Sequence, residues 1–237
     1  MTELLYQTDA YLNEFTARVV ARVEDGVVLD RTAFYPGGGG QPYDTGVLGA
    51  GETRWPVKRM KRVKGQIVHV LEGDDLPEVG DLVDGALDWD RRYELMRTHT
   101  AMHVLCGVIW RDYEASVTGG NMEPLKGRMD FEFETMKAEL VDAIEEAVNK
   151  EISAARPVTV DILPREEAFQ IPDLIRTKIN LLPEGIEEVR VVEIEGLDLQ
   201  ADGGTHVANT REVGPVRVVD YKSKGRINKR IYLEVEG

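Results

Sequence analysis

This sequence is poor in several kinds of residue, and each shortage excludes a class of protein. Cysteine occurs once, as Cys106, so the chain can form no internal disulfide and is typical of a protein kept in a reducing cytoplasm. No apolar run approaches the roughly 18 residues that a membrane-spanning helix needs. Residues 1–13 contain no basic stretch followed by an apolar one, so we expect no secretory signal.

Basic residues are outnumbered, with 29 Lys and Arg against 43 Asp and Glu and a formal net charge of −14. Such a balance argues against indiscriminate binding of nucleic acid, but it allows a local basic surface. What the sequence does contain, 42% hydrophobic and 30% charged residues, describes a soluble globular protein. A length of 237 residues suits one large domain or two modest ones.

Histidine is also scarce, and its placement is informative. The chain has four histidines, and two of them, His99 and His103, are four residues apart. On a helix this spacing places two imidazoles on one face, close enough to bind one metal ion. The helix itself is indicated by residues that recur at helical spacing: Leu95, His99, Met102, His103, Cys106 and Trp110. The alternative is a core helix whose two histidines hydrogen-bond to backbone carbonyls.

A third histidine, His206, follows Asp202 and a Gly-Gly turn that can direct both side chains to one point. Because three of the four histidines fall in two short motifs, the pattern favours a metal site. Three imidazoles with one further ligand or a water are typical of a zinc site with an open position. Thr100 stands where the H-E-x-x-H metalloprotease motif has its glutamate, so we expect no site of that type. Asp202, Cys106 and water are all candidates for the fourth ligand.

Residues 1–90 carry many short strand patterns separated by turns, which favour a small β-barrel. The hydrophobic period changes from two to 3.6 at Asp90, where we place a boundary between domains 1–90 and 91–237. We expect strands at 15–20, 26–29, 47–48, 53–62, 66–71, 127–134, 158–163 and 188–195, a closing hairpin of 213–221 and 230–235, and helices at 90–113, 135–155 and 164–170. Residues 116–121 and 198–206 are expected to be loops or turns.

Residues 37–40 are four consecutive glycines, which are costly in conformational entropy. No Lys-Ser/Thr follows them at P-loop spacing, so we expect no phosphate cradle of that kind. Either the backbone packs closely against another surface or the loop is flexible. The flanking segments, Phe34-Tyr35-Pro36 before and Gln41-Pro42 after, favour a loop of defined shape.

Two basic clusters interrupt the acidic sequence. The first comprises Lys58, Arg59, Lys61, Arg62 and Lys64, and it is either a solvated strand face or a surface that contacts phosphate. The second comprises Lys222, Lys224, Arg226, Lys229 and Arg230, in the loop of the expected closing hairpin. An exposed basic loop suits phosphate contact, although a plain solvated turn has the same composition.

Three motifs follow one another along the chain: Phe34-Tyr35-Pro36-x-Gly38-Gly39-Gly40-Gln41-Pro42, His99-Thr100-Ala101-x-His103 and Gly203-Gly204-Thr205-His206-Val207-x-Asn209-Thr210. Together they resemble the signature of the AlaX family, the free-standing alanyl-tRNA editing proteins related to the editing domain of alanyl-tRNA synthetase. The resemblance covers nearly the whole chain and includes the glycine-rich part of the medium-length members. It implies an α+β fold, in which an N-terminal β-barrel precedes an editing domain whose metal-binding helix packs against an antiparallel sheet.

The resemblance also implies an activity, the zinc-dependent hydrolysis of the ester that links serine or glycine to the 3′ end of tRNA for alanine. It makes His99, His103 and His206 the ligands of one Zn²⁺ per chain. The family usually has cysteine immediately before Gly-Gly-Thr-His, whereas this chain has Asp202. This departure leaves the fourth ligand open and does not affect the three histidines.

By the same resemblance, Thr118 lies where the family tests the substrate side chain. Gln41 and its neighbours Gly38, Gly39 and Gly40 are expected near the same pocket. A site that hydrogen-bonds the serine hydroxyl can reject alanine strongly, because alanine leaves the polar group of the site unpaired. Thr118 can supply such a group. No segment resembles an aminoacylation core, so we expect editing in trans of tRNA charged by another enzyme.

Two other interpretations stay open. One is a zinc hydrolase that acts on a small ester or amide without RNA, and it predicts an activity that barely responds to salt, unlike RNA binding. The other is a non-catalytic RNA-binding module, which a closed site with four protein ligands would favour. The sequence also leaves open the oligomeric state, the general base and the preference between serine and glycine.

Overall fold

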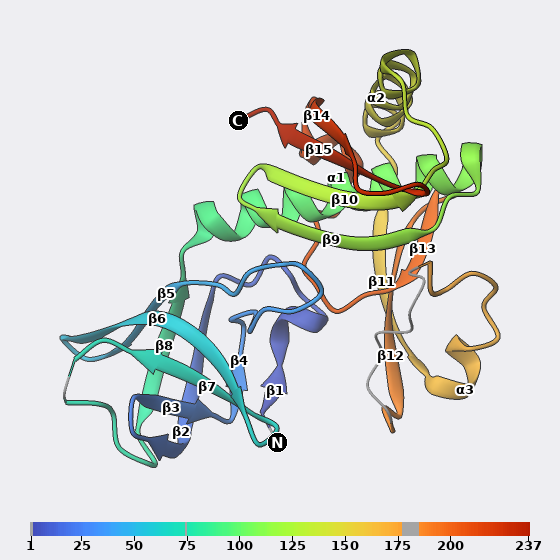
Figure 1. Cartoon of the computed structure of the whole chain (residues 1–237). Helices are drawn as coiled ribbons and strands as arrows, with labels where there is room; N and C mark the ends of the chain where they lie inside the picture. The colour runs from blue at the N-terminus through green and yellow to red at the C-terminus, as the bar shows by residue number, and fades with distance from the viewer. Residues whose placement is uncertain (1, 74, 177–184) are drawn as a thin grey trace. The chain divides into compact units, whose positions relative to one another are not determined.

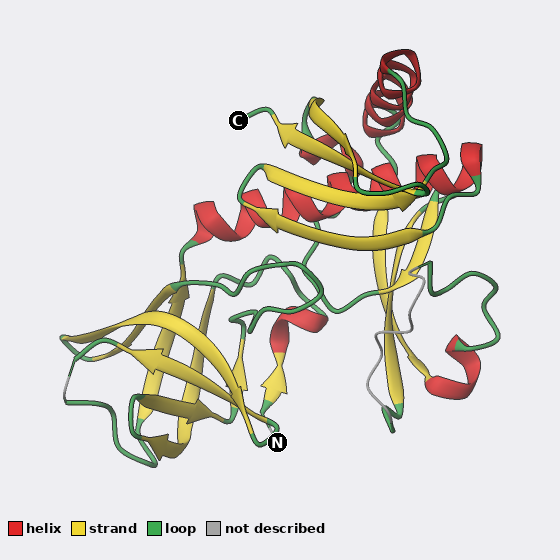
Figure 2. Ribbon diagram, viewed as in Figure 1, coloured by secondary structure: helices red, strands yellow, loops and turns green. Residues whose placement is uncertain are grey.

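The computed structural model describes residues 2–73, 75–176 and 185–237 (Figure 1). The chain divides into two compact units, Met1–Tyr93 and Glu94–Gly237, and the long helix α1 (Trp89–Tyr113) begins in the first and continues in the second. Strands predominate, and most of the helical residues belong to the second unit (Figure 2). The predicted α+β class is therefore confirmed. No helix in the described ranges is both long and apolar enough to span a membrane.

The first unit contains a closed antiparallel barrel of six strands in the order β2-β3-β7-β6-β5-β8. The strands are β2 (Glu14–Val23), β3 (Gly26–Leu29), β5 (Gly46–Ala50), β6 (Thr53–Val63), β7 (Gln66–Leu71) and β8 (Leu82–Leu87). Buried and exposed residues alternate along β8 and over much of β2 and β6, so these strands turn one row of side chains inward. The barrel predicted from the short strand patterns is confirmed.

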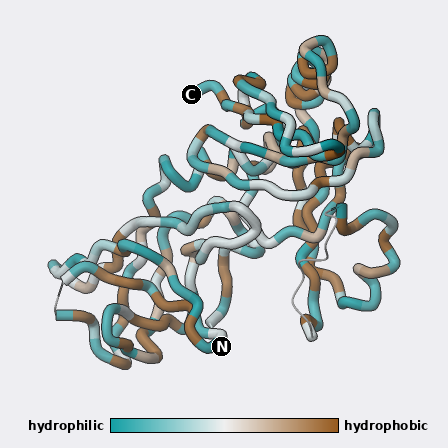
Figure 3. The backbone as a smooth tube through the Cα atoms, viewed as in Figure 1, coloured by the Kyte–Doolittle hydropathy of each residue, from teal (hydrophilic) through white to brown (hydrophobic). Residues whose placement is uncertain are grey.

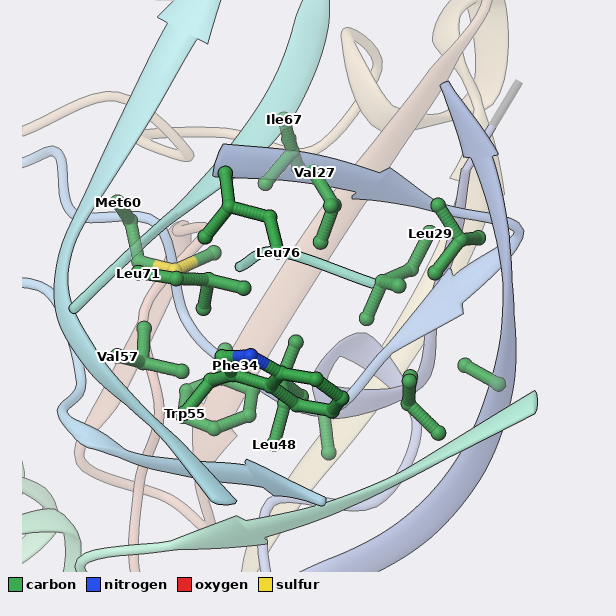
Figure 4. Packing of buried hydrophobic residues seen from close by; sticks show 14 of the residues in the cluster. Val27, Leu29, Phe34, Leu48, Trp55, Val57, Met60, Ile67, Leu71 and Leu76 are labelled. Atoms are coloured by element: carbon green, nitrogen blue, oxygen red, sulfur yellow. The ribbon is translucent and has the colours of Figure 1, made fainter. Parts of the chain in front are cut away.

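Large apolar side chains fill the barrel. Phe34, Leu48 and Trp55 lie together in its core, each almost fully buried (Figure 4). Burying one such side chain contributes about 2 kcal/mol to stability, so the barrel core is a major source of stability. Figure 3 shows hydrophobic stretches along the barrel strands. At Gly85 the core has no room for a side chain, since a Cβ there would lie 2.4 Å from the Phe15 ring.

The glycine-rich loop follows a small parallel pair of strands, β1 (Glu3–Leu4) and β4 (Arg31–Thr32), with the short helix η1 (Leu5–Gln7) between them in sequence. All four glycines of residues 37–40 have positive φ, from 57° to 142°, a backbone conformation that other residues rarely adopt. The loop closes on itself, because Gly38 and Gln41 exchange backbone hydrogen bonds of 3.1 and 2.9 Å. The loop of defined shape that the flanking residues favour is confirmed.

A buried ion pair fixes the end of this loop. The guanidinium of Arg92, which is fully buried, binds the carboxylate of Asp44 and also donates to the carbonyl oxygens of Ala10 and Ala33. The backbone N–H of Tyr35 donates to the same carboxylate at 2.6 Å. Burial of two charges is tolerated only when their hydrogen-bonding groups are paired, as they are at this site. The pair therefore joins the start of α1 to the loop.

The second unit contains a four-stranded antiparallel sheet in the order β14-β15-β10-β9. Its strands are β9 (Val117–Glu123), β10 (Lys126–Glu132), β14 (Val216–Ser223) and β15 (Asn228–Val235). The sheet packs on α1 at Met102, because a Cβ at Gly127 would lie 2.9 Å from the Met102 sulfur. Helix α2 (Ala138–Ser153) is attached to β14 by Asn149, whose amide exchanges hydrogen bonds of 2.8 and 2.9 Å with the backbone of Val216.

A three-stranded antiparallel sheet, β11-β12-β13, completes the second unit. The strands are β11 (Val158–Pro164), β12 (Glu188–Ile194) and β13 (Asp198–Ala201), and the short helices are α3 (Arg165–Ala168) and η2 (Thr210–Val213). The turn after β13 is attached at its far end, where the Val158 N–H donates to Ala208 and the Thr210 N–H donates to Arg156. These bonds fix the segment that carries the third predicted histidine.

Two expected loops are wrong in part. Of these, residues 117–121 of the first expected loop form most of β9, in which Gly119 and Gly120 pair with β10. Glycine weakens strands in general, so local propensity does not predict such a strand, and its formation depends on pairing with a distant segment. In the expected turn 198–206, the first four residues form β13 instead.

The closing hairpin is confirmed, but the expectation that all of its basic residues lie in an exposed loop is wrong. Lys229 belongs to β15 and is 6% exposed, and its amino group donates to the carbonyl oxygens of Gly225 and Arg226. Arg230 follows it in β15 and binds Asp130 through two hydrogen bonds of 2.6 and 2.7 Å. The alternation of a strand turns Lys229 inward. The hairpin cations that stay exposed are Lys222, Lys224 and Arg226.

Candidate metal centre

Four side chains from two distant segments meet in the second unit. His99 and His103 come from α1, and Asp202 and His206 come from the turn after β13. One donor atom from each lies within 4.8 Å of the donor atoms of the other three. The spacing of four residues on a helix and the Gly-Gly turn predict this convergence.

The three imidazoles contact one another. Their ring centroids are 5.0 Å apart for His99 and His103, 4.2 Å for His99 and His206, and 4.7 Å for His103 and His206. Nε2 of His206 lies 3.0 Å from one carboxylate oxygen of Asp202, and Nε2 of His99 lies 3.7 Å from the other. Two donors on a tetrahedral ion with bonds of about 2.1 Å are about 3.4 Å apart, so these separations suit a shared cation.

His103 is oriented by a carboxylate outside the cluster. Its Nδ1 lies 2.9 Å from Oδ2 of Asp198, whose side chain is fully buried. Asp198 also accepts hydrogen bonds from Arg176 at 2.6 Å and from Gln200 at 2.8 Å. Because Nδ1 is paired with a carboxylate, it is the other nitrogen, Nε2, that can face the cluster.

Thr100 attaches the turn to the helix. Its hydroxyl oxygen lies 3.2 Å from Nδ1 of His206 and accepts a hydrogen bond of 3.2 Å from the backbone N–H of Val207. The residue that replaces the metalloprotease glutamate therefore positions the third histidine. His99, by contrast, has a buried Nδ1 with no hydrogen-bond partner among the described residues.

Asp202 is held by its own turn. One of its carboxylate oxygens accepts a hydrogen bond of 2.7 Å from the backbone N–H of Gly204, and its carbonyl oxygen accepts one of 2.9 Å from Arg190. The Asp202 N–H in turn donates to the Arg190 carbonyl at 3.1 Å. These bonds leave the carboxylate directed at the imidazoles, as its distances to His99 and His206 require.

The electrostatics of the site favour neutral rings at His99 and His206 beside an ionised Asp202 carboxylate. Burial lowers the pKa of His206 to about 4 and lowers that of His99 well below its ordinary value. Burial alone would raise the pKa of Asp202, but the surrounding histidines hold it well below its ordinary value. For His103, burial is outweighed by the hydrogen bond to Asp198, which raises its pKa. Deprotonated carboxylate and neutral imidazole are the forms that bind a metal.

Three imidazole nitrogens and one carboxylate oxygen form a donor set that can hold a divalent metal ion, and zinc accepts all of these ligand types. The alternative of core histidines satisfied by backbone carbonyls is wrong. The partners of His103 and His206 are side chains, namely Asp198, Thr100 and Asp202, and the rings face one another.

Cys106 is not a member of the cluster. Its buried thiol lies 3.3 Å from the amide nitrogen of Gln200, and burial raises its pKa. A buried thiol with a raised pKa is a poor source of the thiolate that binds metals. Of the two side chains that the sequence offers as a fourth ligand, Asp202 belongs to the cluster and Cys106 does not.

The other predicted site residues lie elsewhere in the chain. Thr118 belongs to β9, and its hydroxyl donates to the side-chain oxygen of Asn228 at 3.0 Å. Gln41 and the glycines of residues 37–40 belong to the first unit, where Gln41 is 3% exposed. The exposed hairpin cations belong to the second unit. None of these residues is part of the four-residue cluster.

Sequence reasoning missed the residues that support the cluster. Asp198, Arg176 and Gln200 form a buried hydrogen-bonded group around His103. Asp198 precedes Asp202 by four residues, but nothing in the sequence pairs it with a histidine 95 positions earlier. A spacing rule applies within one helix or turn, whereas this contact is between a strand and a helix.

Two family models match parts of the chain. One, described as tRNA synthetases class II (A), matches residues 6–91. The other, described as the second additional domain of threonyl and alanyl tRNA synthetases, matches residues 189–232. The second match contains Asp198, Asp202 and His206 of the group described above.

Similar proteins extend over the full length. The alanyl-tRNA editing protein AlaX-M of Saccharolobus solfataricus is 42% identical over 100% of both chains. The AlaX-M protein of Methanosarcina barkeri is 39% identical over 98% of both. An alanine–tRNA ligase of Ignicoccus hospitalis is 39% identical over 92% of this chain, which corresponds to 24% of the ligase.

Proposed function

Because the chain belongs to the AlaX-M family of alanyl-tRNA editing proteins, we propose that it removes serine or glycine from mischarged tRNA(Ala) by hydrolysis of the ester bond, with one zinc ion per chain. The observation that carries this proposal is the convergence of His99, His103, Asp202 and His206. The single cysteine fits a reducing compartment, so we place the activity in the cytoplasm.

The four clustered residues are the proposed zinc ligands. Bound zinc supplies Lewis-acid chemistry, which polarises a carbonyl oxygen and makes a bound water more acidic. The protein's own contribution is to hold three neutral imidazoles and one carboxylate in place, through Asp198 on His103 and Thr100 on His206. Because the cluster lies almost entirely out of solvent, charge interactions within it are stronger than at the surface.

We propose that Thr118 recognises the serine hydroxyl. Its own proton is donated to Asn228, so its oxygen is free to accept a hydrogen bond. Glycine has no hydroxyl, and its removal therefore does not depend on this contact. Thr118→Val is expected to lower deacylation of Ser-tRNA(Ala) by about 10-fold or more and to leave Gly-tRNA(Ala) nearly unchanged. Equal loss on both substrates would contradict this role.

Gln41 and the backbone of Gly38, Gly39 and Gly40 are proposed to contact the substrate end of the tRNA. Because residues 37–40 are all glycines, this stretch of backbone carries no side chains, which suits close approach of a phosphate or ribose. Gln41 is fixed by its backbone bonds to Gly38. This assignment rests on the family resemblance and on the shape of the loop.

The exposed cations of the closing hairpin, Lys222, Lys224 and Arg226, are proposed to contact tRNA phosphates. The Lys222 ammonium lies 5.0 Å from the centre of the Tyr232 ring, so an aromatic face accompanies the charge. Lys229 and Arg230 support the hairpin from within, because their charges are already used inside it. Lys222 also pairs with Asp220 at 2.7 Å, and in the barrel cluster Lys58 and Lys61 pair with Glu72 and Asp25, so ion pairing does not separate the two clusters.

The direct test is deacylation of Ser-tRNA(Ala) and Gly-tRNA(Ala), with correctly charged Ala-tRNA(Ala) as the control substrate. Chelation is expected to abolish activity and zinc to restore it. His99→Ala and His206→Ala are each expected to lose most of the activity. Undiminished deacylation in both variants would overturn the mechanism.

Salt distinguishes this proposal from hydrolysis of a small ester. Contact of three cations with phosphates predicts that log Kd for tRNA rises with log salt with a slope of about 3. The variant in which Lys222, Lys224 and Arg226 are all changed to Gln is expected to lose that slope. A small neutral ester would show neither effect, and tRNA binding without hydrolysis would indicate a binding module.

A further inference from the structure

We propose that Asp198, held in place by Arg176, is a positioning residue that fixes His103 as a metal ligand. This inference rests on the proposed zinc site and concerns a residue outside the ligand set. Asp198 lies in β13 and touches none of the reacting groups, so it acts through the imidazole it binds. A carboxylate that accepts from Nδ1–H keeps the lone pair on Nε2 and makes that nitrogen a stronger donor.

Both oxygens of the Asp198 carboxylate are occupied. Oδ1 accepts from Arg176 at 2.6 Å, and Oδ2 accepts from His103 at 2.9 Å and from Gln200 at 2.8 Å. The Asp198 side chain is fully buried, and that of Arg176 is 11% exposed. The carboxylate is therefore hydrogen-bonded on both oxygens, and as an acceptor it holds the proton of His103 on Nδ1.

The contact between Asp198 and His103 depends on a glycine of α1, at which the chain around the start of β13 packs closely on the helix. Gly107 lies one turn after His103, where the loop before β13 comes closest to the helix. A Cβ at Gly107 would lie 2.8 Å from Cγ of Leu197 and 3.1 Å from Cβ of Asp198. A residue larger than glycine would push Asp198 away from the helix, so the close approach is built into both segments.

The three histidines are supported unequally. His103 has the Asp198 carboxylate at its outer nitrogen, His206 has the Thr100 hydroxyl, and Nδ1 of His99 has no hydrogen-bond partner among the described residues. A buried ion group of this kind is not needed for stability alone, because apolar side chains of equal volume commonly serve as well. The position of the Asp198–Arg176 pair next to His103, one of the four proposed ligands, indicates a role in binding the metal.

The test is Zn²⁺ affinity, measured by competition with a chromophoric chelator and independent of deacylation. Asp198→Asn keeps the size of the side chain and removes its charge, and it is expected to weaken Zn²⁺ binding by about 10- to 100-fold. The matched control is Glu151→Gln, since Glu151 is also a buried carboxylate but is held by Arg111 and Arg156. The control is expected to keep wild-type affinity within about twofold.

A second measurement separates positioning from folding. In the His103→Ala background, titrated at correspondingly higher Zn²⁺, Asp198→Asn is expected to cost no further affinity, because the residue it acts through is absent. Long-range ¹H–¹⁵N spectra are expected to show His103 protonated on Nδ1 in the wild type and mixed between nitrogens in the variant. Where Asp198→Asn does not fold, Arg176→Gln provides the same test with a smaller expected loss.

An equal loss of affinity in both backgrounds, or wild-type affinity in Asp198→Asn, would overturn this inference and leave the proposed zinc site intact. Failure of the wild-type protein to bind Zn²⁺ would overturn both. A loss confined to the background that retains His103, with the expected change in the spectra, supports it.

Discussion

Both units of the molecule bury histidine, but in different ways. His69 of the barrel is fully buried, with Nε2 2.8 Å from the Thr32 hydroxyl and Nδ1 3.4 Å from the carbonyl oxygen of Val27. In the second unit, Nδ1 of His103 binds Asp198, and His206 has Thr100 at Nδ1 and Asp202 at Nε2, so all of these partners are side chains. The ring centroids of His103 and His206 also lie 5.0 and 4.2 Å from that of His99.

This difference separates a core histidine from the histidines proposed as metal ligands. Burial lowers the pKa of both His69 and His206 to about 4, so burial and pKa do not distinguish them. What distinguishes them is convergence, since His206 shares its space with three other donors, whereas no such group among the described residues includes His69. A strongly shifted pKa therefore indicates burial and becomes a sign of function only when donors gather around it.

The largest expected effect comes from removing a histidine of each kind. Loss of a residue that hydrogen-bonds to a metal ligand lowers metal affinity by about 10- to 100-fold. His206→Gln removes a proposed ligand itself and is therefore expected to lower Zn²⁺ affinity by about 10³-fold or more. His69→Gln is expected to keep Zn²⁺ affinity and to destabilise the protein by about 1–3 kcal/mol, because the Thr32 hydroxyl loses its partner. Competition titrations and urea unfolding measure the two effects. Loss of Zn²⁺ binding in His69→Gln would contradict the distinction between a buried core histidine and a proposed metal ligand.

The next effect concerns the carboxylate that stands where the family usually has cysteine. Thiolate is a softer ligand than carboxylate and binds zinc more strongly, so Asp202→Cys is expected to tighten Zn²⁺ binding by about 10-fold. Asp202→Ser, which supplies neither group, is the control and is expected to weaken binding by a similar factor. Equal Zn²⁺ affinity in all three proteins would show that Asp202 is not a ligand.

A third experiment moves the strand that supports the cluster. Gly107→Ala is expected to weaken Zn²⁺ binding by about 5- to 10-fold and to destabilise the protein by about 1–3 kcal/mol, because the new methyl group collides with Leu197. Gly119→Ala is the control, since the nearest atom to its Cβ lies at an ordinary 3.8 Å. An unchanged affinity in Gly107→Ala would indicate that Asp198 tolerates displacement.

The smallest effect is a shift in acid stability. The pKa of His69 and of His206 is about 4 in the folded protein and near 6.5 when unfolded, so the unfolded chain binds more protons between these values. Without metal, both units therefore lose stability as the pH falls from about 6.5 to about 4. Because the proposed site exists only in the folded protein, added Zn²⁺ is expected to lower the midpoint pH of acid unfolding of the second unit by roughly one pH unit.

Amide NMR signals assigned to each unit report its acid unfolding separately. The signals of the barrel are expected to keep the same midpoint pH when Zn²⁺ is added. A common shift in both units would mean that they unfold together.

The sequence predicts what depends on local periodicity. Alternation along strands such as β8 gives the barrel, and the spacing of His99 and His103 gives half of the cluster, because both patterns repeat within one element. The Gly-Gly turn gives Asp202 and His206, since a tight turn brings its two ends together.

The features that were wrong or missed depend on pairing between distant segments. Residues 117–121 become a strand only because β10 lies beside them, and Lys229 is buried only because its position in β15 turns it inward. Asp198 reaches His103 from 95 residues away, where Gly107 lets the two segments approach closely. The roles of Thr118 and Gln41 stay predictions, because they depend on a bound substrate.

The handedness of the glycine loop bears on how residues 37–40 can be studied. Gly39 has a φ of +57°, which is the mirror image of an ordinary helical value. L-Alanine there introduces backbone strain, so a conventional alanine scan would confuse a misshapen loop with a lost contact to RNA. D-Alanine, introduced by chemical ligation, prefers that same φ and adds one methyl group. D-Alanine at Gly39 therefore tests whether residues 37–40 contact RNA without distorting the loop.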